Sequence, residues 1–320
     1  MGKKGKRTGK AGSAVAKQGP GKARRERAAA IKDFEKRLDA LIETLEAELQ
    51  GKDMFPPLDE QKREECPLCL KPLPLVSAAA DTTGMFYCCG QLVCMACKDA
   101  WDETARTKFA PCPLCRSDPP ADVEEQIGRL KRRADANDAK VVYELSKLYL
   151  VGCLDQEKVY LKPDSIKSFE LKLRAAELQN SQSLYSLGIF FLQEPSERDA
   201  EEVDGLDGLQ KDKHRGIHLL EYAARMGNAF AHQQLGGLYK EGEEIIGRQD
   251  FEEIIGRHDY DLSLKHFTYA ARCGYGDSLE MLRDFTREER VSVDEFVEIE
   301  KACKEANGQD DEESTASDDE

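Results

Sequence analysis

Eight cysteines lie within fifty residues of one another, at spacings that suit metal coordination. They form four pairs, which in chain order are Cys66 and Cys69, Cys88 and Cys89, Cys94 and Cys97, and Cys112 and Cys115. A Cys-x-x-Cys turn directs two thiolates at one ion, and thiolate is a soft ligand that suits zinc. Two such turns complete one tetrahedral site, and the third turn then needs Cys88 and Cys89. The sequence therefore predicts two Zn(II) ions, each held by four cysteines.

A redox-active Cys-x-x-Cys motif is the alternative chemistry, but it accounts for one pair rather than four. Residues 62–120 are too few to build a good hydrophobic core, so bound zinc would supply the missing stability. No apolar run is long enough to span a membrane, and no apolar segment follows the basic start of the chain. These features favour a reducing compartment, the cytoplasm or the nucleus, where disulfides are a poor explanation for eleven cysteines.

The order and spacing of the four pairs resemble the RING finger in an all-cysteine, C4C4-like form. In that family the pairs interleave, which implies that the first and third pairs share one zinc ion and the second and fourth pairs share the other. The implied ligands are Cys66, Cys69, Cys94 and Cys97 for zinc 1, and Cys88, Cys89, Cys112 and Cys115 for zinc 2. The resemblance also implies a short β-hairpin followed by a helix within residues 62–120.

The chain departs from the RING pattern at its second pair of ligands. The fourth ligand of the family is usually histidine, and no histidine lies nearby. Cys88 and Cys89 are also adjacent, whereas the family normally leaves at least one residue between these ligands. Vicinal ligands on one ion are strained, so a water molecule or a shifted geometry in place of Cys88 remains an open alternative.

Four residues match the surface on which RING-type ubiquitin ligases bind a ubiquitin-conjugating enzyme (E2). The resemblance implies that Leu68, Trp101 and Pro113 bind a ubiquitin-loaded E2, and that Arg116 is a basic linchpin that contacts E2 and ubiquitin together. Such catalysis works by positioning, since cysteines bound to zinc are poor nucleophiles. The alternative roles are packing of a small core for the three apolar residues and a solvated surface charge for Arg116.

Helices that position such a site are indicated downstream by a repeated pattern. Pairs of alanines at 175–176, 223–224 and 270–271 recur at intervals of 48 and 47 residues. Seven positions before each pair lies a small residue, namely Ser168, Gly216 and Ser263. Small residues at this spacing let two helices cross closely, and a glycine after the later two pairs suits a left-handed helix end. The pattern predicts αα-hairpins that stack into a solenoid.

This pattern resembles the Sel1 repeat, a relative of the tetratricopeptide repeat. The resemblance covers residues 139–303, with repeats at 139–180, 181–228 and 229–276 and a partial fourth repeat at 277–303. It implies that the solenoid binds a protein partner on its concave surface.

Other segments connect or interrupt these units. Residues 121–138 are predicted to form a linker helix, residues 193–214 an acidic loop, and residues 243–260 a duplicated nine-residue insertion with no assigned role. The remaining cysteines are expected to be buried in the repeats, and they are Cys153, Cys273 and Cys303.

The two ends of the chain carry opposite charge. Residues 1–30 carry a net charge of +9 and are predicted to be a basic disordered tail, and residues 304–320 an acidic disordered tail. The formal net charge of the whole chain is −15, and residues 31–308 alone carry −17. At 31–51 the apolar residues recur at helical spacing, which predicts an amphipathic helix that packs on its own domain. The pattern spans only about two heptads, which is too short to predict a coiled coil.

Together these features predict a mainly α protein with a small zinc-stabilised RING and a Sel1-like solenoid. The favoured function is a RING-type E3 ubiquitin-protein ligase whose solenoid recruits a protein partner, and the acidic body suits a basic one. The alternative is a non-catalytic zinc-binding scaffold for protein–protein interaction. Nucleic acid is the least favoured partner, because the basic tail has no aromatic residue on which a base could stack.

Overall fold

The computed structural model describes residues 20–58, 65–71, 73, 83–108, 110–155, 158–194, 205–206, 208–242 and 259–307. These residues are mainly helical, with two short antiparallel hairpins. Residues 1–19 and 308–320 of the predicted tails lie outside the described residues, as does the duplicated insertion up to residue 258. None of the helices in the described part of the chain is both long enough and apolar enough to span a lipid bilayer.

The predicted β-hairpin and helix are present in the cysteine-rich module, which comprises residues 65–120. Strands β1 (Thr83–Phe86) and β2 (Gln91–Cys94) pair antiparallel, with Phe86 opposite Gln91, and α2 (Met95–Lys108) follows directly. The small core beneath the hairpin is formed by apolar side chains and cysteines, including Leu73, Phe86, Val93, Cys66 and Cys112.

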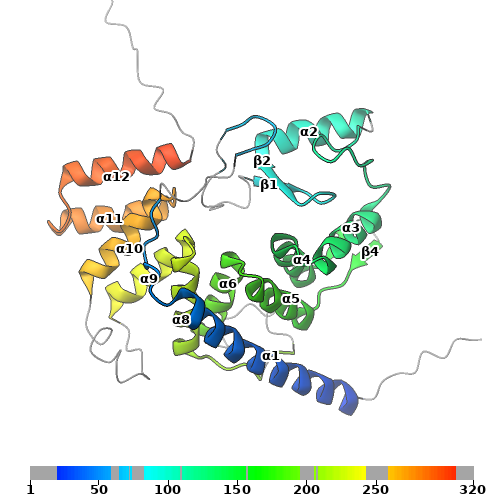
Figure 1. The fold of residues 1–320 in the computed structure, drawn as a ribbon, viewed down its shortest axis with the longest axis horizontal. Coiled ribbons are helices and arrows are strands. Elements are labelled where there is room, and N and C mark those ends of the chain that lie inside the picture. The colour runs from blue at the N-terminus through cyan, green and yellow to red at the C-terminus, as the bar shows by residue number, and fades with distance from the viewer. Residues whose placement is uncertain are drawn as a thin grey trace, which may run out of the picture.

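The rest of the chain forms a curved row of helices (Figure 1). They are α3 (Val123–Asp135), α4 (Ala139–Val151), α5 (Ser165–Glu177), α6 (Ser181–Leu192), α8 (Lys213–Arg225), α9 (Ala229–Glu241), α10 (Tyr260–Arg272), α11 (Asp277–Arg287) and α12 (Val293–Ala306). Helix α4 packs on α5, α6 on α8 and α9 on α10, and each hairpin packs on the next through α5 and α6, α8 and α9, and α10 and α11. The predicted αα-hairpin solenoid is therefore confirmed. The partial fourth repeat is a hairpin as well, since α11 packs on α12.

Within each hairpin, small residues mark the place where the two helices cross. A Cβ on Gly188 of α6 would lie 3.0 Å from the carbonyl oxygen of Gly216 on α8. In the next repeat the Ser263 hydroxyl donates to the carbonyl of Gly236, at 2.7 Å. The crossing that was predicted from the small residues is thus a direct approach of the two backbones.

The turns after the alanine pairs share one conformation. Gly227 and Gly274 have φ of 79° and 97°, as predicted, and Gln179 adopts the same left-handed conformation at 59°. Asn137 after α3 repeats it at 60°. Helix α3 therefore ends like the second helix of a repeat and packs on α4, so the predicted linker helix is the first helix of the solenoid.

The same backbone hydrogen bond closes the loop between the two helices in three successive hairpins. An aspartate caps the second helix of each of the first three hairpins, and its backbone N–H donates to the carbonyl of an aromatic residue near the end of the first helix. The pairs are Asp164 with Tyr149 (2.7 Å), Asp212 with Phe191 (3.0 Å) and Asp259 with Tyr239 (3.1 Å). Because this bond closes each insertion, loops of different length leave the hairpin unchanged. The first insertion carries β3 (Cys153–Asp155) and β4 (Lys158–Leu161).

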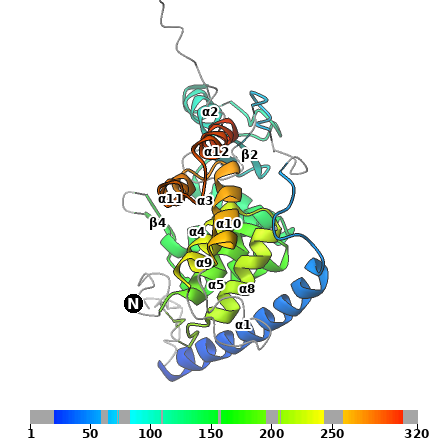
Figure 2. The ribbon, with the colours of Figure 1, turned by 90° about the vertical axis from the view of Figure 1, so that its left-hand side faces the viewer.

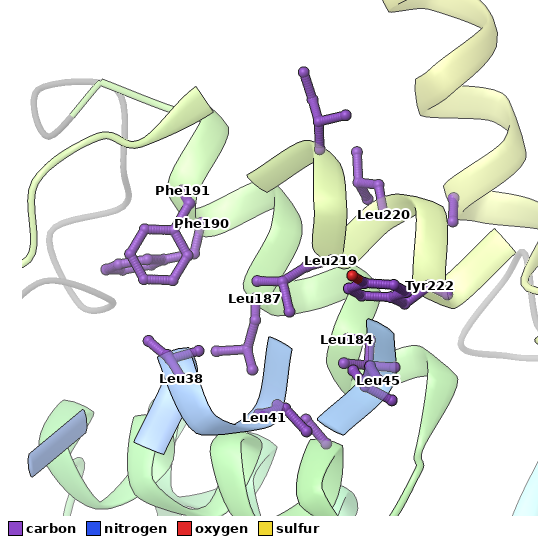
Figure 3. Packing of buried hydrophobic residues seen from close by; sticks show 14 of the residues in the cluster. Leu38, Leu41, Leu45, Leu184, Leu187, Phe190, Phe191, Leu219, Leu220 and Tyr222 are labelled. Atoms are coloured by element: carbon purple, nitrogen blue, oxygen red, sulfur yellow. The ribbon is translucent and has the colours of Figure 1, made fainter. Parts of the chain in front are cut away.

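Helix α1 spans Pro20–Leu49, which extends the predicted helix of residues 31–51 toward the N-terminus. The expectation of a disordered tail is therefore wrong for residues 20–30, because alanine and arginine are strong helix formers and extend a helix that is already packed. Phe34, Leu38, Leu41 and Leu45 are buried against α5, α6 and α8 (Figure 3). The helix packs on its own chain, as predicted.

The segment after α1, residues 50–58, continues along the repeats and is called the strap. Arg225 of α8 donates to the carbonyl of Lys52 at 3.2 Å, and the Tyr269 hydroxyl donates to the carbonyl of Pro56 at 2.9 Å. Viewed from the side, α1 lies along one edge of the repeats below α8 (Figure 2). One continuous stretch of chain thus holds three successive repeats together.

Two other predictions are modified by the structure. The acidic loop ends at Asp212, since α8 starts at Lys213, and its Leu206 and Leu209 are buried in the core shared with α1. Cys273 and Cys303 are buried as predicted, whereas Cys153 in β3 is only half-buried.

Candidate metal centre

The first and last cysteine pairs sit in turns of the same shape. Leu70 donates its backbone N–H to the carbonyl of Cys66 at 2.8 Å, and Arg116 donates to the carbonyl of Cys112 at 2.9 Å. Both Leu70 and Arg116 follow the second cysteine of their pair and have left-handed backbones, with φ of 60° and 58°. A non-glycine residue rarely adopts this conformation, so two matching examples indicate that the turn geometry is imposed by the cysteine pairs.

The other two pairs are carried by the hairpin and by α2. Cys88 and Cys89 lie in the tight turn between β1 and β2, where Gly90 donates to the carbonyl of Phe86 at 2.7 Å. Cys94 ends β2 and Cys97 lies in the first turn of α2. The second and third pairs therefore lie at opposite ends of β2, which keeps them apart.

The eight sulfurs gather in two groups of four, within each of which all Sγ atoms lie within 4.8 Å of one another. The groups are Cys66, Cys69, Cys94 and Cys97, and Cys88, Cys89, Cys112 and Cys115. The Sγ atoms of Cys69 and Cys94 are 3.7 Å apart, and those of Cys88 and Cys115 are 3.4 Å apart. Tetrahedral Zn–S bonds of about 2.3 Å would separate neighbouring sulfurs by about 3.8 Å. Each group could therefore hold one metal ion, and the grouping is the interleaved one.

The electrostatics of the two groups suit a cation at their centres. Against the effect of burial, hydrogen bonds from backbone groups of its own site lower the pKa of Cys66 to about 6. The pKa of Cys115 also falls to about 6, because hydrogen bonds from Ser117 outweigh burial. Burial and the neighbouring thiols raise the pKa of Cys88. In the second group, Cys115 thus ionises easily and lies beside Cys88, which does not. A divalent cation between them would favour the thiolate form of both.

The cysteine-rich module is fixed to the first helices of the solenoid. Met85, Tyr87 and Leu92 of the hairpin pack in one cluster with residues of α3, α4 and α5. At the tip of the hairpin, a Cβ on Gly90 would lie 2.8 Å from the guanidinium of Arg133, which itself pairs with Asp138. The turn that carries Cys88 and Cys89 therefore touches α3 directly.

Sequence reasoning missed Arg129 of α3, which holds the segment after the last cysteine pair. Its Nη1 donates to the carbonyl of Asp118 at 2.6 Å, and its Nη2 pairs with Glu125 at 2.6 Å. The sequence signal was the spacing of Glu125 and Arg129, four residues apart on a helix. This arginine fixes the path of the chain just beyond Arg116.

The four residues predicted to face E2 lie in different surroundings. Leu68 is 37% exposed and Arg116 is exposed, whereas Pro113 is half-buried. Trp101 is half-buried too; its ring packs edge-on against Phe86 at 6.4 Å. It lines a cavity of about 640 Å³ between the module and helices α3 and α4. Leu68, Pro113 and Arg116 are not among the described residues that line this cavity. Trp101 is therefore separated from them in its surroundings, and its position is explained largely by its packing on Phe86.

Comparison with solved structures finds helical repeat proteins. A Sel1 repeat protein from Oxalobacter formigenes is 21% identical, with a TM-score of 0.42, and the match covers 59% of this chain and 65% of that protein. The protective antigen c5321 of uropathogenic Escherichia coli, which displays an SLR fold, is 23% identical with a TM-score of 0.41, over 56% of this chain and 33% of the antigen. The match thus spans less than two thirds of either protein. No protein-family model and no curated protein matches the chain.

Proposed function

We propose that the chain is a RING-type E3 ubiquitin-protein ligase that holds a protein partner on Sel1-like repeats. The observation that carries the proposal is the interleaved grouping of eight cysteine sulfurs in two sets of four. Zn(II) is the metal that suits all-thiolate, tetrahedral sites, and two such ions would be held. Eight cysteines stay available as thiolates under the reducing conditions of the cytoplasm or nucleus. In this proposal all eight cysteines, including Cys88, are ligands.

The zinc ions would supply structural stability to the cysteine-rich module and no step of the reaction. Leu68 offers an exposed apolar side chain on the first turn, and with Pro113 and the accessible part of Trp101 it would bind a ubiquitin-loaded E2. Arg116 is exposed on a rigid turn, so its guanidinium would donate hydrogen bonds to E2 and ubiquitin at once. Transfer would then be accelerated by orientation of the thioester rather than by a nucleophile of this chain.

The test is autoubiquitination of the full chain with a panel of E2 enzymes. Leu68→Ala and Arg116→Ala should each abolish the activity, whereas two matched controls should retain it. Leu70→Ala alters an exposed leucine on the same turn, and Arg132→Ala an exposed arginine on α3. Zinc content measured for each variant separates loss of folding from loss of E2 binding. Activity that survives both Leu68→Ala and Arg116→Ala would overturn the mechanism.

A non-catalytic scaffold is the second candidate, and the attachment of the module to the solenoid favours it. Met85, Tyr87 and Leu92 are buried or half-buried against the first repeat, as expected of a structural extension of the solenoid. A scaffold would bind two zinc ions and show no ubiquitin transfer with any E2 of the panel. Its acidic body suits a basic protein partner.

A further inference from the structure

The first third of α1 extends beyond the part of the helix that packs on the repeats. Residues 24–29 are all exposed, and the first buried side chain of α1 is Phe34. The helix therefore continues for about 15 Å from Pro20 before its apolar packing begins at Ala30, and ahead of that point Arg27 lies beside Gly205. This exposed part carries the basic residues that the sequence groups near the start of the chain.

Basic side chains form a stripe along the outer face of α1. Lys22, Arg25, Lys32 and Lys36 follow one another at steps of three, seven and four residues, which places them on one side of a helix. That side is opposite the buried stripe that starts at Phe34. All four basic residues are exposed. We call them the basic stripe.

The basic stripe is not neutralised by the described part of the chain. Arg25, Lys32 and Lys36 form no ion pair there, and Lys22 meets only Glu26, at 3.7 Å on the exposed surface. Two acids beside the stripe are engaged elsewhere. Asp33 pairs with Arg37 at 3.7 Å, and Asp39 pairs with Arg215 of α8 at 2.8 Å. These two carboxylates therefore pair with arginines outside the basic stripe.

The charge pattern of the chain points to a long polyanion. The stripe runs for about 21 Å, and six more basic residues precede it in the sequence. With Arg24 and Arg27, which lie between Lys22 and Lys32, residues 1–30 hold ten basic side chains and one acidic one. Residues 31–308 carry −17 and repel a polyanion from the rest of the surface. A nucleic acid offers closely spaced phosphates over such a length, whereas a short acidic peptide would match only part of it.

We propose that the basic stripe of α1 binds the phosphate backbone of nucleic acid without reading its sequence. No aromatic residue occurs within residues 1–30, and the first one of α1, Phe34, is buried, so bases have no side chain on which to stack. Affinity then comes from the phosphates and falls steeply with salt. Because α1 packs on α5 and α8, a nucleic acid bound there is attached to the repeats rather than to the cysteine-rich module.

The test measures fluorescence anisotropy of labelled single-stranded RNA and of duplex DNA with the full chain over a salt series. The variant combines Arg25→Gln, Lys32→Gln and Lys36→Gln, which keeps good helix formers in α1. The control combines Lys162→Gln, Lys265→Gln and Lys304→Gln, three exposed lysines of the repeats, and changes the net charge by the same amount. Circular dichroism and zinc content confirm that both proteins are folded.

Loss of three phosphate contacts should lower the slope of log affinity against log salt by about 2 on single strands, and weaken binding about tenfold or more at low salt. The control should bind like the wild-type chain, and the preferred probe distinguishes RNA from duplex DNA. Absence of binding by the wild-type chain, or equal weakening of variant and control, would overturn the proposal. Polyglutamate that competes as well as unlabelled RNA would assign the stripe to an acidic protein instead.

Discussion

Stability of the third repeat should depend on pH through two buried histidines. His232 of α9 and His266 of α10 are fully buried, and their Nδ1 atoms are 2.9 Å apart. The Nε2 of His232 lies 3.2 Å from the carbonyl of Ala224, so this nitrogen carries the hydrogen. His232 Nδ1 must then accept from His266 Nδ1. Phe55 of the strap packs on both rings, with centroids 5.4 and 4.8 Å away.

The direction and size of the effect follow from burial. Burial lowers the pKa of His232 to about 3, and burial together with His232 lowers the pKa of His266. In the unfolded chain both groups titrate near 6.5. Below that pH the histidines bind protons in the unfolded state but stay neutral in the folded state. The free energy of unfolding therefore has its full value above about pH 6.5 and falls as the pH is lowered toward 3. At about pH 5 the loss for His232 alone is about 2 kcal/mol, and His266 adds to it.

The measurement is urea unfolding at about pH 7.5 and about pH 5 of the wild-type chain and of the double variant His232→Gln, His266→Gln. Both proteins contain the same thiols and carboxylates, so their protonation, including competition for zinc, cancels in the difference. The wild-type chain should lose at least about 2 kcal/mol more than the variant between the two pH values. The variant's own stability is immaterial to this comparison. Equal losses in the two proteins would refute the reasoning.

Three further substitutions test the packing and the metal centre. Gly188→Ala should destabilise the chain by about 1–3 kcal/mol in urea unfolding, because its Cβ would meet the backbone of α8. The control Gly237→Ala places its Cβ in open space and should stabilise the chain by about 0.5–1 kcal/mol. Equal effects of the two substitutions would contradict the close helix crossing. Leu38→Ala should cost about 2–5 kcal/mol and exposed Glu43→Ala less than about 0.5 kcal/mol, unless α1 is detached in solution. Cys115→Ser should reduce the zinc content seen by native mass spectrometry from two ions to one; two retained ions would argue against the eight-cysteine scheme.

The zinc sites and the helix crossings are predictable from the sequence, because few residue types can form either one. Four thiolates are needed for each tetrahedral site, so the spacing of the cysteine pairs is informative before any fold is known. The alanine pairs and small residues indicate a helix crossing because only small side chains allow it, as Gly188 and Gly216 show. The N-terminal extent of α1 gives no such signal, because residues 23–30 are alanine, arginine and a single glutamate with no apolar stripe. The paired histidines were missed, since His232 and His266 are 34 residues apart in the sequence.

The attachment of the cysteine-rich module to the solenoid is also invisible in the sequence, because Met85, Tyr87 and Leu92 could equally serve the core of the module itself. In the structure they pack on the first helices of the solenoid. Both cysteine pairs of the second group are held by α3: Gly90 beside Cys89 approaches Arg133, and the segment after Cys115 is bound by Arg129.

The first cysteine group instead carries the exposed side chain of Leu68, which we propose to bind E2. The two groups therefore differ in role. In the proposed function, the second group orients the module on the repeats and the first presents Leu68 to E2. Loss of the metal proposed for the second group would then release the turn against α3, and with it the orientation in which Leu68 is presented.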